Sequence, residues 1–79
     1  MNKNLAAIDI GSNTVQLLIN KYSNRILVSQ ESYLRTTRLG NTGANGDLSA
    51  EAIDATIAAL QEFCHIAQKN RVSQMRILA

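Results

Sequence analysis

Hydrophobic and polar residues follow a strand-like pattern over the first 33 residues of the chain. A short apolar run at residues 5–10 ends at a glycine, which is typical of a strand buried on both faces. Residues 14–22 and 25–33 each alternate apolar with polar side chains, which is the period of two of a strand. We expect these two segments to form an antiparallel hairpin around a turn at Ser23 and Asn24.

The periodicity is lost between residues 34 and 48. Three glycines recur there among asparagine and aspartate residues, at Gly40, Gly43 and Gly46. This composition is typical of a loop, and an unpatterned loop of this length is usually functional or disordered.

A long helix is predicted over residues 50–70. Ser49 is placed to cap its N-terminus, and Glu51 lies in the first turn, where the positive end of the helix dipole favours a carboxylate. Apolar residues recur at steps of three and four and are expected to form the buried face of the helix. They are Ile53, Ile57, Leu60, Phe63, Cys64 and Ala67.

Residues 74–79 have the composition of a further strand. The order of strand, hairpin, helix and strand predicts an α/β fold in which the helix crosses over the sheet to deliver the last strand. Because that strand begins just before the sequence ends, we expect residues 1–79 to be one incomplete domain.

Composition indicates a cytoplasmic protein. A single cysteine, Cys64, cannot form an internal disulfide, which favours a reducing compartment. The N-terminal apolar run is interrupted at Asp9 and is too short for a signal peptide or a membrane span. We therefore expect no membrane partner.

Nucleic-acid binding is not expected. The net charge is +2, and the basic residues are scattered along the chain apart from Arg35 and Arg38, so they form no stripe for a phosphate backbone. Three aromatic residues offer little surface for stacking bases.

The candidate chemistry lies in residues 9–14, at the connection between the first two predicted strands. Gly11 permits a sharp turn, and the N–H groups from Gly11 to Thr14 are expected to form a concave nest for phosphate oxygens. The side chains of Ser12, Asn13 and Thr14 add further donors. A carboxylate at Asp9 beside a phosphate implies an intervening Mg²⁺ or an oriented water. The alternative is a polar turn in which Asp9 accepts hydrogen bonds from local N–H groups.

Two common phosphate-binding motifs are excluded by the residues around this turn. No Gly-Lys-Ser/Thr follows Gly11, so the turn is not a P-loop. The dinucleotide fingerprint G-x-G-x-x-G is absent as well.

The turn resembles the opening of the exopolyphosphatase and guanosine pentaphosphate phosphohydrolase (Ppx/GppA) phosphatase family. The resemblance begins in residues 7–14, where Ser12 and Asn13 match this family better than other members of the actin-like ATPase superfamily. It continues through residues 38–40, 46–53 and 76–79, so it covers essentially the whole chain. It implies a partial ribonuclease-H-like domain, the N-terminal part of such a phosphatase.

The resemblance also implies a function. The intact protein would hydrolyse the terminal phosphate of polyphosphate or pppGpp with Mg²⁺. Asp9 would hold the metal or orient the water. Phosphate would be bound by Gly11, Ser12, Asn13, Thr14 and Arg38, although Arg38 is also compatible with a solvated loop arginine.

The family's catalytic glutamate and second phosphate loop would lie beyond Ala79. No catalytic residue is therefore expected within residues 1–79, and the chain alone is expected to be inactive. The sequence departs from the family at Thr14, which replaces a more frequent serine, and at Val15 and Gln16, where an aromatic residue and a histidine are frequent. These departures concern substrate preference.

Other interpretations remain open. The chain could be a stand-alone binding or oligomerisation module that pairs through an unfinished sheet edge, or a fragment of a sugar-kinase-like ATPase. His65 has no second metal-ligating partner in the sequence pattern and is expected to be solvated. Asp54 and Glu62 are likewise expected to lie on the solvated face of the helix.

Overall fold

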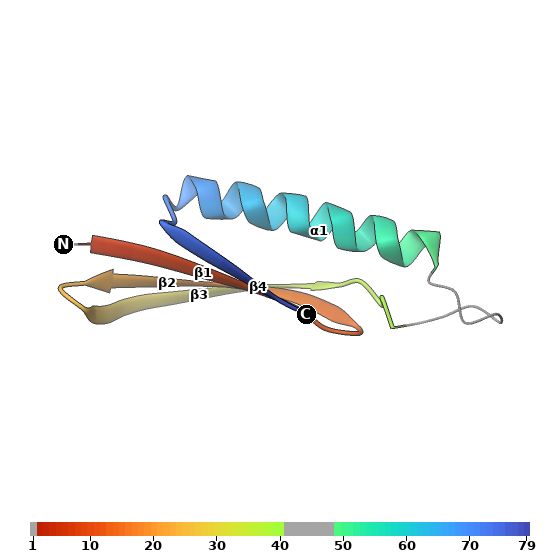
Figure 1. Ribbon diagram of the computed structural model, residues 1–79, viewed down its shortest axis with the longest axis horizontal. Coiled ribbons are helices and arrows are strands. Elements are labelled where there is room, and N and C mark those ends of the chain that lie inside the picture. The colour runs from red at the N-terminus through yellow and green to blue at the C-terminus, as the bar shows by residue number, and fades with distance from the viewer. Residues whose placement is uncertain (1, 41–48) are drawn as a thin grey trace.

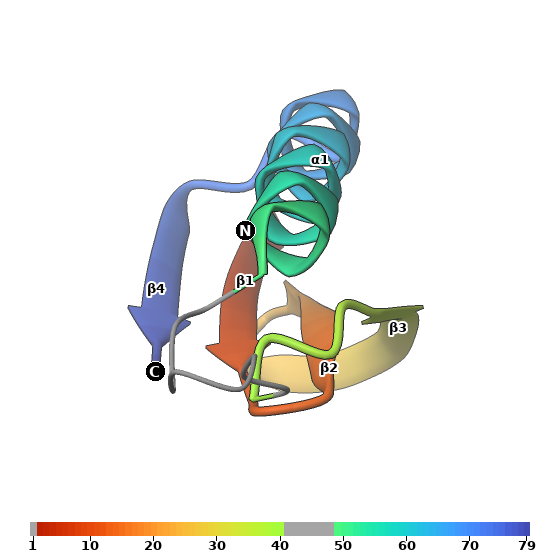
Figure 2. The ribbon, with the colours of Figure 1, turned by 90° about the vertical axis from the view of Figure 1, so that its right-hand side faces the viewer.

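The molecule is a four-stranded sheet with one long helix packed on one face (Figures 1 and 2). The computed structural model describes residues 2–40 and 49–79. The elements are β1 (Asn2–Ile10), β2 (Thr14–Ser23), β3 (Ile26–Thr36), α1 (Ala50–Lys69) and β4 (Gln74–Leu78). The predicted residues 41–48 of the long loop lie outside the described residues.

The strand order is β3-β2-β1-β4. β1 pairs with β2 and β2 pairs with β3 in antiparallel fashion, whereas β4 lies parallel to β1. A parallel neighbour requires a crossover connection, and α1 provides it. The predicted α/β architecture, with its hairpin, long helix and terminal strand, is confirmed.

The turn between β2 and β3 differs from the prediction by one residue. Its two central residues are Asn24 and Arg25, with φ of 51° and 67°, and Ser23 pairs with Ile26 across it. Positive φ at both central positions suits the twist of a two-residue hairpin, and asparagine tolerates this conformation well. A register shift at Lys21 in β2 accompanies the change.

β3 is longer than the alternating pattern predicted. It extends to Thr36, which pairs with Thr14 at the start of β2. The partner strand therefore sets where β3 ends, so the predicted loop at residues 34–48 begins too early.

The core lies between the sheet and α1. β1 and β2 turn alternate side chains toward the helix, and Ile8, Leu17 and Ile19 have no exposed surface. Phe63 of α1 is also fully buried against this cluster. Complete burial of such a side chain contributes about 1.5–3 kcal/mol.

The buried face of α1 was predicted correctly only in part, and the predicted Leu60 is partly buried against the core. The helix buries small residues together with Phe63 and Ala67, which were predicted, whereas Ile53 and Ile57 are 39% and 49% exposed. Cys64, expected in the core, is exposed. The residues that face the sheet are Ala52, Thr56, Ala59, Phe63 and Ala67.

The physical reason is that α1 carries two neighbouring apolar stripes, both with helical spacing. One step along the sequence is a rotation of about 100° around the helix. The sheet covers the alanine-rich stripe and leaves Ile53 and Ile57, of the isoleucine-rich stripe, exposed.

Arg35 ties the helix to the edge strand β3. Its Nε donates to Oε2 of Glu62 at 3.1 Å, and its guanidinium lies 5.9 Å from the centre of the Phe63 ring. Within the described residues, no helix combines the length and apolar character needed to cross a membrane.

Candidate phosphate-binding site

The candidate site is the tight connection between β1 and β2. β1 ends at Ile10, and the backbone N–H of Gly11 donates to the carbonyl of Thr14 at 2.9 Å, which closes the turn. Gly11, Ser12 and Asn13 are exposed. The connection between β1 and β2 lies at one end of the sheet (Figures 1 and 2).

The segment after β3 is bound to this turn through its backbone. The N–H groups of Thr37 and Arg38 both donate to the carbonyl of Asn13, at 2.9 and 3.1 Å. Gly40 donates its N–H to the carbonyl of Ser12 at 2.5 Å. The structure thus brings together the two segments that the sequence singled out separately, residues 9–14 and 38–40.

Close approach of the two backbones explains the glycine at position 40. A Cβ atom there would lie 2.8 Å from the Cβ of Ser12, which is closer than real Cβ contacts, and 3.1 Å from the Ser12 carbonyl oxygen, which is a tight contact. At Gly11 the nearest atom to an added Cβ would be the Thr14 carbonyl oxygen at 3.3 Å, a milder contact. Gly40 is therefore the more stringent of the two requirements.

The turn offers donors to an anion, but not all of those expected from the sequence. The N–H of Gly11 is already used within the turn. The N–H groups of Ser12 and Asn13 donate to no acceptor within residues 2–40 and 49–79. With the exposed side chains of these two residues they form a concave set of donors of the kind that binds phosphate oxygens.

Asp9 stands beside the turn on the open face of the sheet. Ile8 is fully buried toward α1, and successive side chains of a strand point to opposite faces, so the exposed Asp9 carboxylate lies on the face that α1 does not cover. Asp9 pairs with Gln16 of β2 and Leu78 of β4.

The side chains available as metal ligands decide which kind of metal ion could bind beside the turn. Residues 2–40 and 49–79 contain no group of three or more His, Cys, Asp or Glu side chains that could bind a metal ion together. These residues therefore do not suit a structural zinc, which needs four protein ligands. A single exposed carboxylate suits Mg²⁺, which keeps several waters and uses one or two carboxylates together with substrate phosphates.

Arg38 contacts the turn through its backbone N–H, which donates to the Asn13 carbonyl. The structure shows no hydrogen bond between its guanidinium and the turn within the described residues. Arg38 has a φ of 55° and is exposed. Its side chain lines a cavity at the start of α1, together with Thr37 and Glu51.

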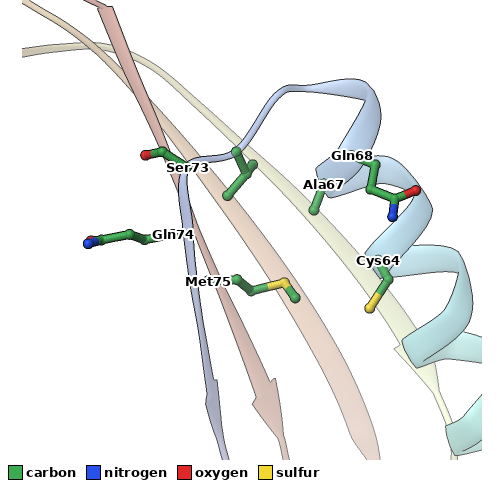
Figure 3. Close-up of a pocket in the computed structure, with 7 residues that line it drawn as sticks. Cys64, Ala67, Gln68, Ser73, Gln74 and Met75 are labelled. Atoms are coloured by element: carbon green, nitrogen blue, oxygen red, sulfur yellow. The ribbon is translucent and has the colours of Figure 1, made fainter.

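A second cavity, of about 230 Å³, lies at the opposite end of the sheet from Asp9. It is formed by the end of α1 and the start of β4, including Cys64, Gln68 and Met75 (Figure 3). No Asp, Glu, Lys, Arg or His side chain is among the described residues that line it. The nearby His65 is exposed.

The sequence did not predict the backbone hydrogen bonds between residues 37–40 and the turn. Their signal was present in the spacing of Arg38 and Gly40, since a glycine that is required by a close contact marks where two backbones meet. The burial of Thr37 had no signal in the sequence, because it results from this contact.

Comparison with solved structures identifies relatives of this arrangement. A member of the Ppx/GppA family from Aquifex aeolicus aligns with a TM-score of 0.89 and 29% identity, over 98% of this chain and 26% of that one. A Ppx/GppA phosphatase from the same organism gives 0.87 and 31%, over 95% and 25% of the two chains. An exopolyphosphatase from Cytophaga hutchinsonii gives 0.84 and 26%, over 95% and 24%.

The chain is thus similar in fold to members of the Ppx/GppA family over nearly its whole length. The family resemblance seen in the sequence is thereby confirmed, together with the fold. The chain spans about a quarter of the length of these Ppx/GppA proteins. No family model matches the sequence. No curated protein matches it either.

Proposed function

We propose that this chain supplies one phosphate-binding wall of a phosphatase that releases the terminal phosphate of linear polyphosphate or of pppGpp. The observation that carries the proposal is the exposed turn at residues 11–14, held in place by three backbone hydrogen bonds from residues 37–40. Support comes from the Ppx/GppA relatives, one described as a phosphatase and another as an exopolyphosphatase.

The turn binds the terminal phosphate group. The free N–H groups of Ser12 and Asn13, with the Ser12 and Thr14 hydroxyls, donate to its oxygens. Because the hydrogen bonds from residues 37–40 fix the backbone before the ligand arrives, little conformational entropy is lost on binding.

Asp9 supplies the carboxylate for a divalent cation. Mg²⁺ bound there, directly or through a water, would neutralise phosphate charge and help to activate the attacking water. Without a cation, the Asp9 carboxylate repels the phosphate. Phosphate binding at the turn should therefore depend on Mg²⁺.

Residues 1–79 provide only one side of such a site. Phosphoanhydride hydrolysis requires charge stabilisation around the transferring group. The family resemblance implies a second phosphate loop and a catalytic glutamate beyond residues 1–79. The chain alone should bind phosphate compounds weakly and should not turn them over.

A chimera tests the proposal. The matching quarter of the Aquifex aeolicus phosphatase is replaced by this chain, and release of phosphate from polyphosphate and pppGpp is measured with Mg²⁺. We expect activity that Asp9→Asn lowers by about 100-fold or more, in line with the loss of one electrostatic group from an active site. Asp54→Asn, a change of the same kind on the exposed surface of α1, is the control and should have no effect.

The outcomes separate the alternatives. Equal activity of the Asp9→Asn and Asp54→Asn chimeras would refute the role of Asp9. A chimera that hydrolyses ATP in preference to both phosphate substrates would favour the sugar-kinase-like interpretation. The preferred substrate of an active chimera decides between polyphosphate and pppGpp.

One observation favours a second candidate, an assembly module. β4 is an edge strand within the described sheet, and Ile77 and Leu78 are each 56% exposed on it. Edge strands are templates for pairing with another chain. A mass that rises with concentration in sedimentation equilibrium would support this function, and a monomer at high concentration would oppose it.

A further inference from the structure

A cavity of about 310 Å³ lies beside the first turn of α1, across residues 37 and 38 from the turn at 11–14. Thr37 and Arg38 line one side, and Ser49 and Glu51 line the other. Neither the proposed phosphatase chemistry nor the comparisons assign it a role.

The N-terminus of α1 supplies free donors at this cavity. The Ser49 hydroxyl accepts from the N–H of Ala52 at 3.0 Å, and the Ser49 carbonyl accepts from Ile53 at 3.1 Å. The N–H groups of Ala50 and Glu51 have no acceptor within the two described ranges. Unused N–H groups and the positive end of the dipole favour an anion.

Thr37 gives an independent indication that something binds here. The residue is 4% exposed, yet its Oγ1 has no hydrogen-bond partner. Its backbone is fixed by the hydrogen bond to Asn13. Thr37 lines the cavity, and rotation about χ1 moves its hydroxyl among three staggered positions around Cβ. A buried hydroxyl without a partner is unfavourable, and an oxyanion in the cavity would accept from it.

Two charged side chains have opposite effects on the affinity of this cavity for an anion. The Arg38 guanidinium carries a positive charge and has the donor geometry that suits phosphate oxygens. The Glu51 carboxylate repels an anion at the same place. Binding should therefore be weak and sensitive to salt.

We propose that this cavity binds a phosphate-type oxyanion through the Thr37 hydroxyl, the Arg38 guanidinium and the N–H groups of Ala50 and Glu51. The proposal goes beyond the function above, because it uses neither Asp9 nor the donors of residues 11–14 and needs no divalent cation. The oxyanion is either free phosphate or a second phosphoryl group of a chain whose end occupies the turn.

The test is a titration of the ¹⁵N-labelled 79-residue chain with inorganic phosphate in the presence of EDTA, followed by backbone amide shifts. We expect saturable shifts at Ala50 and Glu51 while Ser12 and Asn13 stay unchanged. Absence of saturable shifts at Ala50 and Glu51, whether the chain is folded or not, overturns the proposal. This result would leave the Mg²⁺-dependent role of the turn untouched.

Matched variants locate the binding groups. Thr37→Val should weaken binding about tenfold, as expected for a hydrogen bond to a charged group, without loss of stability. Thr56→Val removes another buried hydroxyl, one that donates to the Ala52 carbonyl at 2.8 Å, and should leave phosphate affinity unchanged. Equal effects of the two variants on affinity would contradict a direct role of Thr37.

Charge variants test the electrostatics. Glu51→Gln should strengthen phosphate binding about threefold, the size of a helix-terminus charge effect, whereas Asp54→Asn on the same helix should change it less. A weaker affinity in Glu51→Gln would exclude an anion in this cavity.

A titration with tripolyphosphate and Mg²⁺ identifies the source of the oxyanion. If one chain bridges both places, the amides of Ala50 and Ser12 will shift with one common midpoint, and Thr37→Val will weaken both. If the cavity binds free phosphate independently, the two midpoints will differ, and Thr37→Val will alter only that of Ala50.

Discussion

At the scale of single residues, the carbonyl of Asn13 and the absent side chain of Gly40 determine the geometry of the site. Asn13 accepts two N–H groups from the segment after β3, and Gly40 allows that segment to lie against Ser12. The carbonyls of Ser12 and Asn13 bind residues 37–40, and the N–H groups of the same two residues donate to no acceptor within the described residues. The turn is thus formed before a ligand binds.

Gly40→Ala should loosen this arrangement. The added Cβ would lie 2.8 Å from the Ser12 Cβ, so the segment must shift, with a cost of about 1–3 kcal/mol in the free energy of unfolding. Gly11→Ala is the matched change and should cost about 1 kcal/mol or less, since its nearest contact is 3.3 Å. Urea unfolding measures both, and a larger loss in Gly11→Ala would contradict the close contact.

The pair formed by Arg35 and Glu62 predicts a dependence of stability on acid pH. The hydrogen bond from Arg35, with a smaller Coulombic contribution, lowers the pKa of Glu62. A carboxylate with a lowered pKa stabilises the fold fully above the pKa of the unfolded chain, about 4.3, and this contribution is lost as the pH falls through the pKa of the folded state.

Unfolding of the chain and of Glu62→Gln should therefore be compared between neutral pH and about pH 3. The difference in the free energy of unfolding between the two should shrink as the pH falls. Since both side chains are nearly half exposed, the effect should be modest and should weaken with added salt. A difference that is constant with pH would show that the pair does not form in solution.

At the scale of elements, the strands and the helix could be predicted from the sequence because their periodicities are local. The buried face of α1 could not, because Ile57 and Phe63 both belong to stripes with helical spacing. Only the sheet decides which stripe is covered. The turn between β2 and β3 was displaced for a similar reason, since the register of the paired strands fixes it at Asn24 and Arg25.

Alanine substitutions on α1 distinguish the two stripes. Phe63→Ala removes a fully buried ring and should cost about 3–5 kcal/mol, enough to unfold much of a chain of this size. Ile57→Ala removes a side chain that is 49% exposed and should cost about 1 kcal/mol or less. Chemical denaturation measures both, and equal costs would mean that the helix is rotated from its position here.

At the scale of the whole molecule, the sheet carries a helix on one face (Figure 2). Asp9 lies on the other face, where β1 pairs with β4. The motif at residues 9–14 and its family could be recognised from the sequence, because the chemistry is concentrated in one short turn. The contact of this turn with residues 37–40 and the cavity at the start of α1 required the structure, since both depend on segments that are distant in sequence. We propose that this chain contributes one preformed side of a phosphate site.

The measurement that tests this account most directly is a titration of the ¹⁵N-labelled chain with pyrophosphate, with and without Mg²⁺. We predict saturable shifts of the Ser12 and Asn13 amides that require Mg²⁺ and are lost in Asp9→Asn but retained in Asp54→Asn. Amides of Ser12 and Asn13 that stay unchanged in the presence of Mg²⁺, or that shift equally in the Asp9→Asn chain, would contradict a cation-assisted phosphate site at this turn.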